Sequence, residues 1–316
     1  MISWEEAVNF IEVQQLVKRY GDFTAVDGVS FEVAPGQVFA LLGPNGAGKT
    51  STIRVLMGIL FPDGGEVRLL GKPPQQSREQ VGYLPEARGL YRDARLLELL
   101  AYLGTLKGMR AAEARDRASQ WLERLNLGDW AERKVHELSR GMQQKAQLVA
   151  ALMHDPPVVV LDEPFQGLDP VNIQLAKRLV VDLRAAGKAV LLSSHQLVHV
   201  EALADEVALI NRGRIVARGS LEALQRHYAR GDLAVRLAGG ATLPEGLPVQ
   251  RVTSRNGVWT MLPQRGVSPQ EVLRALVASG TPVERFEVVY PSLEEIFLRA
   301  VEETTGDTAP AKEVQP

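Results

Sequence analysis

The sequence contains no cysteine, and it has no hydrophobic run long enough to cross a membrane. The missing cysteine excludes disulfide bonds and cysteine-ligated metal sites, and it fits a reducing cytoplasm. A membrane-spanning helix needs about 18 consecutive apolar residues, and no run in the chain approaches that length. The first ten residues hold Glu5 and Glu6 without a basic start, so we do not expect a signal peptide. If the protein works at a membrane, a partner must supply the membrane-embedded part.

The charges of the chain are nearly balanced, so no excess of one sign marks it as a binder of nucleic acid. The chain has 36 lysine and arginine residues and 38 aspartate and glutamate residues, which gives a formal net charge of −2. A strongly basic chain attracts nucleic acid whatever its fold, and this chain has no such bias. Its 316 residues are 45% hydrophobic, which is enough for a sizeable core and for one or two domains.

A glycine-rich stretch joins a strand pattern to a helix pattern. Residues 38–42 are all apolar and predict a buried strand, and residues 53–57 have apolar side chains at helical spacing. Strand, glycine-rich loop and helix are the context of a phosphate-binding P-loop, although a chance glycine turn before a helix is the alternative. Glycine lets backbone N–H groups turn inward around an anion, and the helix adds its N-terminal dipole. The candidate phosphate-binding residues are Gly43, Pro44, Asn45, Gly46, Ala47, Gly48, Lys49, Thr50 and Ser51.

Three side chains at the end of this loop suit phosphate chemistry. Lys49 is placed to reach the β- and γ-phosphates of a nucleoside triphosphate, and the Thr50 hydroxyl is placed to ligate Mg²⁺. Ser51 adds a contact on the side of the α-phosphate. Such a loop identifies a phosphate site and leaves open which reaction takes place there.

Two adjacent carboxylates follow a second buried strand. Residues 158–161 are a short apolar run of β-branched character, typical of a parallel strand, and Asp162 and Glu163 come directly after it. At the carboxyl end of that strand, beside the P-loop, Asp162 would hold Mg²⁺ through water. Glu163 would point beyond the γ-phosphate and act as general base on an attacking water. The alternative is a strand end with two solvated acids.

A histidine follows the next strand pattern. Residues 189–193 predict a buried strand, and His195 lies two residues after it. If this strand also ends near the nucleotide, His195 could donate to the γ-phosphate and orient the attacking water. A lone histidine after a strand is more commonly a surface or packing residue.

A second anion site is predicted at residues 138–145. Ser139 is a candidate N-cap of a helix, and Gly141 adds an exposed backbone N–H in the first turn of that helix. The alternative is that these residues only cap the helix. A second anion site in a chain with a single P-loop suggests that two copies share their nucleotides.

The order of the patterns predicts the organisation of the chain. Residues 1–10 are an extension without an assignable role, and strands separated by helices from residue 11 on predict an α/β fold with a parallel sheet. The pattern is helical from about 84 to 153, and Asp169 caps a helix ending near Gly187. Short alternating segments and two capping boxes predict a small separate α+β domain over 221–303. Residues 304–316 are expected to be a disordered tail.

Taken together, these motifs resemble the nucleotide-binding subunit of an ABC transporter. The P-loop, residues 138–145, residues 161–164, residues 167–169 and the pair 194–195 occur in the order and spacing of that family, over about 11–219. The resemblance implies a P-loop NTPase fold of ABC type over 11–220, with a parallel-sheet core, an antiparallel β subdomain and a helical subdomain over about 85–153. It also implies ATP and Mg²⁺ as ligands, with ATP contacts from Tyr20, which would stack on adenine, and from Asp169.

In this family two subunits sandwich two ATP molecules, which implies that Ser139 and Gly141 contact the γ-phosphate of ATP held by the partner copy. The sequence departs from the family pattern at several positions. Glu86 stands where glutamine is usual, and it would meet the nucleotide, Mg²⁺ or water with an added negative charge. Arg140, Met142 and Gln166 also replace commoner residues. With the motif at 291–297, these variants resemble a bacterial subgroup of drug-resistance-type and sodium-extrusion-type exporter ATPases, which carry an extra C-terminal domain.

The resemblance therefore implies an ATPase that works as a homodimer, or as a heterodimer with a second ATPase subunit, at the cytoplasmic face of the membrane. Its other partners would be integral-membrane permease subunits that carry out export, with no nucleic acid. One rival is a soluble ABC ATPase that acts on ribosomes or DNA, but such relatives carry two cassettes or a long coiled coil. Another is a nucleotide-binding regulator without turnover, which the presence of Glu163 and His195 opposes.

Overall fold

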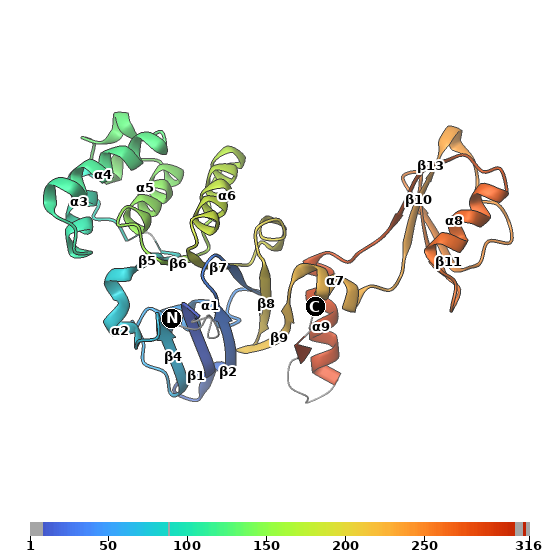
Figure 1. Ribbon diagram of the computed structural model, residues 1–316, viewed down its shortest axis with the longest axis horizontal. Coiled ribbons are helices and arrows are strands. Elements are labelled where there is room, and N and C mark those ends of the chain that lie inside the picture. The colour runs from blue at the N-terminus through green and yellow to red at the C-terminus, as the bar shows by residue number, and fades with distance from the viewer. Residues whose placement is uncertain (1–8, 88, 307–311, 314–316) are drawn as a thin grey trace, which may run out of the picture. The chain divides into compact units, whose positions relative to one another are not determined.

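The computed structural model describes residues 9–87, 89–306 and 312–313 (Figure 1). The chain divides into two compact units. The first, called here the N-terminal unit, comprises Met1–Leu221 and Ala300–Gln315, and the second, the C-terminal unit, spans Glu222–Arg299. Most of the predicted extension at residues 1–10 lies outside the described residues, but Phe10 N–H donates to Val33 O at 2.9 Å.

A seven-stranded sheet forms the centre of the N-terminal unit, in the order β14-β9-β8-β3-β7-β6-β5. Strands β5, β6, β7, β3 and β8 run parallel, β9 pairs antiparallel with β8, and β14 pairs parallel with β9. Every residue of β3, β6 and β7 is buried, as expected for parallel strands covered on both faces. This confirms the predicted α/β fold. The bounds are Val38–Leu42 (β3), Val81–Leu84 (β5), Val158–Asp162 (β6), Ala189–Ser194 (β7), Glu206–Asn211 (β8), Arg214–Gly219 (β9) and Lys312–Glu313 (β14).

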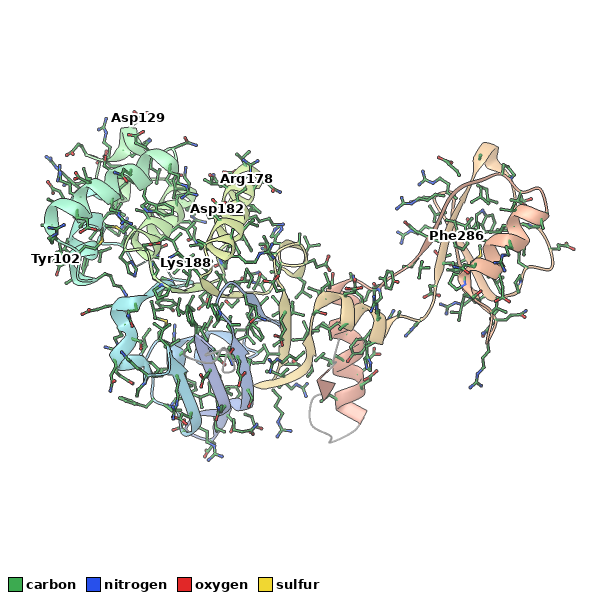
Figure 2. The ribbon with its side chains drawn as sticks, in the orientation of Figure 1. Tyr102, Asp129, Arg178, Asp182, Lys188 and Phe286 are labelled. Atoms are coloured by element: carbon green, nitrogen blue, oxygen red, sulfur yellow. The ribbon has the colours of Figure 1, made fainter. Side chains whose placement is uncertain are left out.

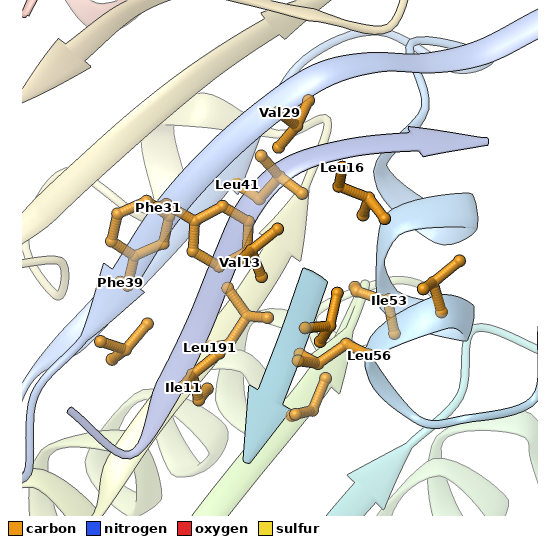
Figure 3. Packing of buried hydrophobic residues seen from close by; sticks show 14 of the residues in the cluster. Ile11, Val13, Leu16, Val29, Phe31, Phe39, Leu41, Ile53, Leu56 and Leu191 are labelled. Carbon is orange, nitrogen blue, oxygen red and sulfur yellow. The ribbon is translucent and has the colours of Figure 1, made fainter. Parts of the chain in front are cut away.

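A three-stranded antiparallel sheet packs beside this core, as the family resemblance implies. Its order is β2-β1-β4, with β1 at Ile11–Tyr20, β2 at Phe23–Val33 and β4 at Gly64–Leu69. The side chains between this sheet, the parallel sheet and helix α1 (Lys49–Leu56) form one hydrophobic cluster (Figure 3). At its centre the rings of Phe31 and Phe39 stack with centroids 4.8 Å apart. This core fixes the loop between β3 and α1.

Helices fill the chain between β5 and β6 and cross over between β6 and β7. Arg124 of α4 forms a 2.6 Å ion pair with Asp182 of α6, a residue labelled in Figure 2. Among the described residues, no helix is long and apolar enough to span a bilayer. The helices are α2 (Pro74–Ser77), α3 (Leu96–Leu106), α4 (Ala111–Arg124), α5 (Arg140–Leu152) and α6 (Pro170–Ala185), with 3₁₀ turns η1 (Arg78–Gln80), η2 (Gly128–Trp130), η3 (Val135–Glu137) and η4 (Leu197–His199).

The expectation of helix from residue 84 is wrong up to residue 95, because helix α3 starts only at Leu96. The segment before it uses its backbone elsewhere: Arg92 O accepts from His136 N–H at 3.0 Å, and Ala94 O accepts from Val135 N–H at 3.1 Å. Apolar spacing cannot reveal these long-range hydrogen bonds. The described residues between β5 and α3 therefore form a loop, and Glu86 in this loop lines a cavity described below.

The C-terminal unit has a four-stranded antiparallel sheet in the order β11-β12-β10-β13. Helix α8 (Pro269–Ala278) packs its Val272 and Leu276 on one face of this sheet, together with Leu233 and Met261, and Phe286 of β13 lies against the same cluster (Figure 2). Both predicted capping boxes are present, since Ser268 pairs with Glu271 and Ser292 with Glu295. The strands are Leu233–Leu237 (β10), Val249–Arg255 (β11), Val258–Pro263 (β12) and Val283–Val288 (β13), and a 3₁₀ turn covers Ala238–Gly240 (η5).

Two further helices precede and follow the strands of this sheet in the sequence, α7 (Leu221–Tyr228) and α9 (Leu293–Gly306). Helix α9 continues three residues past the predicted end of the domain, so the expectation of disorder from residue 304 is wrong for 304–306. The Thr304 hydroxyl donates to Ala300 O at 2.7 Å within this last turn. The content of threonine, proline, alanine and charge predicted a tail, but the Thr304 hydroxyl bonds to the helix itself. The rest of the predicted tail, apart from β14, lies outside the described residues.

Candidate nucleotide-binding site

The loop between β3 and α1 has the tight backbone that a P-loop requires. A Cβ at Gly43 would lie 2.2 Å from Ile210 O, so β8 leaves no room for a side chain there. At Gly48 the φ angle is +110°, and a Cβ would lie 2.4 Å from Ala25 O. Glycine is therefore required at both positions, at the start of the loop and at the N-terminus of α1.

Lys49 is buried within this loop. Its Nζ donates to Gly43 O at 2.7 Å and to Pro44 O at 3.2 Å, and it lies 3.5 Å from Glu163 Oε1. The ammonium group thus bridges the loop and the end of β6. Carbonyl oxygens are acceptors that a phosphate oxygen can replace, so this position suits a lysine that transfers its hydrogen bonds to a ligand.

A cavity of about 260 Å³ opens over the loop. Near its mouth the Tyr20 hydroxyl lies 3.4 Å from Ser51 Oγ. Sequence reasoning missed Phe23 and Ala25 in the lining, and an aromatic residue three positions after Tyr20 was the available signal for Phe23. The cavity brings together many of the residues predicted from the sequence. Its lining is Tyr20, Phe23, Ala25, Asn45, Gly46, Ala47, Gly48, Lys49, Thr50, Ser51, Glu86 and Glu163.

Asp162 lies fully buried at the end of β6. Ser193 of the adjacent β7 donates its hydroxyl to Asp162 Oδ1 at 2.5 Å, while Oδ2 has no hydrogen-bond partner among the described groups. Burial raises the pKa of Asp162, the hydrogen bond from Ser193 opposes the rise, and the charges of Glu86 and Glu163 add to it. Sequence analysis did not single out Ser193, because a small polar residue in an apolar strand gives no pattern of its own.

Glu163 has a left-handed backbone, with φ of +52°, which is unusual for a non-glycine residue and concentrates at functional sites. Its N–H donates to Ser193 O at 3.2 Å and to Ser193 Oγ at 3.1 Å. Its Oε2 lies 2.9 Å from His195 Nδ1, although that nitrogen lacks the geometry of a hydrogen bond. The strained turn therefore aims a buried carboxylate between Lys49 and His195, at the edge of the cavity.

The residues present fit a Mg²⁺ ion bound together with phosphates. Asp162 Oδ2 and Glu163 Oε1 are buried oxygens without hydrogen-bond partners, and Thr50 Oγ1 lies 3.5 Å from Glu86 Oε2. No group of three or more His, Cys, Asp or Glu side chains with metal-binding geometry occurs in the described part of the chain. Mg²⁺ takes one or two carboxylates and completes its shell with water and substrate phosphates, so this sparse set suits it.

Of the predicted residues outside the cavity lining, Gly43, Pro44, Asp162 and His195 lie next to it in the sequence or by their contacts, and three others form a second group. The Ser139 hydroxyl accepts from Met142 N–H at 3.3 Å, which makes it the N-cap of α5. The nearest neighbours of a Cβ at Gly141 would be Asn172 Nδ2 and Leu168 Cδ2, each 3.9 Å away. Asp169 caps α6 by accepting from Asn172 N–H at 2.9 Å, and that hydrogen bond lowers the pKa of Asp169. The two helix N-termini therefore meet around Asn172.

Comparison with known proteins agrees with this geometry. Residues 26–166 match the family described as "ABC transporter", and residues 219–301 match "ATP-binding protein DrrA1-3-like, C-terminal domain". The chain is 37% identical to the uncharacterized ABC transporter ATP-binding protein YhaQ of Bacillus subtilis, over 92% of this chain and 98% of that protein. It is 43% identical to the Nod factor export ATP-binding protein I of Paraburkholderia xenovorans, over 68% and 72%.

A solved structure described as an ATP-binding subunit of an ABC transporter superposes with a TM-score of 0.65. The two chains are 32% identical, and the match covers 69% of this chain and 93% of the other. The phosphate loop, the buried carboxylates and the N-terminus of α5 all lie within residues 26–166, the range that matches the ABC transporter family. The chain belongs to the ATP-binding subunits of ABC transporters, and it carries the C-terminal domain of the DrrA1-3-like type.

Proposed function

We propose that this chain hydrolyses ATP as part of an exporter, with each ATP held between two copies of the ATPase subunit. Membership in the family makes the chain an ATP-binding subunit and an ABC transporter ATPase. The observation that carries the proposed mechanism is the pair of buried carboxylates at the edge of the P-loop cavity, held by Ser193 and aimed past Lys49.

In this mechanism the P-loop amides and Lys49 bind the phosphates, and Tyr20 stacks on the base. Lys49 exchanges its bonds to Gly43 O and Pro44 O for bonds to phosphate oxygens. Glu163 accepts a proton from the attacking water, and His195, 2.9 Å from it, orients that water and donates to the γ-phosphate. Thr50, Asp162 and Glu86 would hold Mg²⁺, which would supply positive charge against the charge that develops on the phosphates.

The separation of the two anion sites supports a shared nucleotide. The cavity over the P-loop is not lined by Ser139, Gly141 or Asp169 among the residues that the structure describes. The N-terminus of α5 is nevertheless exposed and preorganised by the Ser139 cap. A second copy in a head-to-tail arrangement would bring Ser139 and Gly141 to the γ-phosphate. The second copy is either identical or a related ATPase subunit.

An apolar cavity supports contact with a permease. It measures about 480 Å³ and lies between the parallel sheet and the helices, with exposed Ile59 and Leu106 in its lining. Tyr91, in the loop before α3, and Tyr102 of α3 are also largely exposed. We propose that a cytoplasmic helix of the membrane permease packs here and holds the ATPase at the cytoplasmic face of the membrane. The pairing of ABC cassettes with membrane permeases in transporter complexes supports such a contact, and the likeness to a Nod factor export subunit supports export.

The variant Glu163→Gln tests the proposed chemistry. A general base contributes roughly 10²–10⁴-fold, so ATP turnover is expected to fall by about that factor while ATP binding persists. Glu98→Gln makes the same exchange at an exposed position of α3 and is expected to keep turnover within twofold. Turnover by Glu163→Gln within a few-fold of the parent would remove Glu163 from this role.

A further inference from the structure

The phosphate-binding cavity is unusually rich in negative charge. Two carboxylates, Glu86 and Glu163, line it, and Asp162 lies buried beneath them. Among the described side chains of the lining, Lys49 is the single cation. Free ATP carries about four negative charges, so a cavity lined by two carboxylates and one ammonium, with the buried carboxylate of Asp162 close by, receives a ligand that is itself strongly anionic.

Glu86 differs from the other two carboxylates because it is exposed and weakly held. Asp162 accepts from Ser193 at 2.5 Å, and Glu163 lies within ion-pair distance of Lys49 and His195. Glu86 has one contact within the described structure, 3.5 Å from Thr50 Oγ1. Its position in the loop after β5 leaves the side chain free to adjust around a ligand.

Glu86 is also within electrostatic reach of the other acidic groups. Burial raises the pKa of Asp162, and the charge of Glu86 adds to that rise. The same charge contributes to the pKa of Tyr83, which burial raises to about 12. A charge that affects both residues in this way also affects phosphates bound at Thr50. Two unit charges about 10 Å apart at a protein surface repel or attract each other strongly enough to change a binding constant on the order of tenfold.

We infer that Glu86 makes nucleotide binding by this subunit strongly dependent on a divalent cation. Resting on the proposed nucleotide site, this inference adds that the site selects the metal–nucleotide complex over the free nucleotide. Without the cation Glu86 repels the phosphates. With the cation Glu86 becomes favourable, because its carboxylate then faces positive charge at Thr50. A glutamine at this position would bind both forms of the nucleotide with less discrimination.

The test measures nucleotide affinity rather than turnover. The full-length protein and the variants Glu86→Gln, Glu86→Asp and Glu98→Gln are titrated with the non-hydrolysable analogue AMP-PNP by calorimetry, once with Mg²⁺ and once with EDTA. Circular dichroism melting curves confirm that each variant is folded. The quantity compared is the ratio of the dissociation constant in EDTA to that in Mg²⁺. When cation and nucleotide bind together, each changes the affinity of the protein for the other by the same factor. The ratio of the two dissociation constants therefore measures the coupling between cation binding and nucleotide binding.

We expect Glu86→Gln to lower the ratio about tenfold, mainly because AMP-PNP then binds more tightly in EDTA. Glu86→Asp keeps the charge and is expected to keep most of the ratio, and Glu98→Gln to leave it unchanged. A ratio for Glu86→Gln within twofold of the parent would overturn the inference, and so would equal losses in Glu86→Asp and Glu86→Gln. Failure of the parent protein to bind AMP-PNP even with Mg²⁺ would instead overturn the proposed nucleotide site itself.

Discussion

The N-terminal and C-terminal units differ in how completely their polar groups are satisfied. Within the described residues, the buried side-chain atoms without hydrogen-bond partners all belong to the N-terminal unit. Three of the five side chains concerned, Asp162, Glu163 and His195, stand together at the P-loop cavity, and Gln147 and His154 are the others. In the C-terminal unit, by contrast, paired capping boxes at Ser268 and Ser292 satisfy exposed helix ends. Buried polar groups without hydrogen-bond partners lower stability. The group formed by Asp162, Glu163 and His195 therefore indicates a site that is kept for binding a ligand.

Non-glycine residues with positive φ occur in both units, and Asn256 and Glu163 show two different reasons for such a backbone. In the C-terminal unit the described non-glycine residue with positive φ is Asn256, at +51°. It precedes Gly257 in the two-residue turn between β11 and β12, where such angles suit a hairpin. Glu163, at +52°, has no such local reason, because it lies after a parallel strand. One strained residue builds a turn, and the other aims a carboxylate.

The largest effect after the loss of the general base is expected from Ser193→Ala. This change leaves both oxygens of buried Asp162 without a donor and removes one acceptor of Glu163 N–H. We expect a loss of about 1–3 kcal/mol in the free energy of unfolding and a clear fall in ATP turnover. Differential scanning calorimetry and an ATPase assay measure the two effects.

Ser194→Ala is the matched control, since the Ser194 hydroxyl bonds only to the backbone of Gln196 among the described groups. It is expected to cost less than Ser193→Ala and to keep most of the turnover. Equal turnover in the two variants would show that Ser193 does not support the carboxylates.

His154 offers a pH-dependent comparison away from the cavity. Burial, with Lys107 nearby, lowers the pKa of His154 from its ordinary 6.5 to about 4. Between these values the unfolded chain binds the proton more strongly, so the stabilising contribution is complete above about pH 6.5 and is lost as the pH falls toward 4. His154→Leu removes the linkage, and the difference in unfolding free energy between parent and variant should change by on the order of 2 kcal/mol from pH 7 to 4.5.

Urea unfolding of both proteins at a series of pH values measures that difference. Parallel stability curves for parent and variant would mean that His154 titrates alike in the folded and the unfolded chain.

The smallest effect is expected from Ser268→Ala in the C-terminal unit. The Ser268 hydroxyl accepts from Glu271 N–H at 3.3 Å, and loss of such a cap costs about 1 kcal/mol. Because the cavity over the P-loop has no lining residue from this unit in the described part of the chain, ATP turnover should stay within twofold of the parent. Calorimetry and an ATPase assay would show the separation. A fall in turnover as large as that of Ser193→Ala would mean that the C-terminal unit takes part in the nucleotide chemistry.

The sequence was informative where chemistry and pattern coincide in a short stretch. Glycines at 43 and 48, the acids after β6 and the N-cap serines each combine a residue type with a local element, and the structure has those elements at the predicted positions. Ser193 could not be predicted, because its role depends on β7 lying beside β6 with Asp162 opposite it. The loop over 85–95 was mistaken for helix because its backbone partners lie some forty residues away, near Val135. A local sequence pattern contains no information about strand pairing or hydrogen bonds between residues far apart in the chain.

The sharing of each ATP between two copies is the central claim, and a mixture of two inactive variants tests it most directly. Lys49→Ala disables the P-loop, and Ser139→Arg blocks the second anion site, each in a Glu163→Gln background that stops turnover. In a mixed dimer, one site combines both defects and the other combines an intact P-loop with an intact Ser139. Pulling down one tagged copy shows that mixed dimers form, and retained radiolabelled ATP is then counted per dimer. The account predicts one occluded ATP per mixed dimer and none in either parent homodimer. Mixed dimers that retain no more ATP than the parents would contradict it, and would place Ser139 in a site built within one copy.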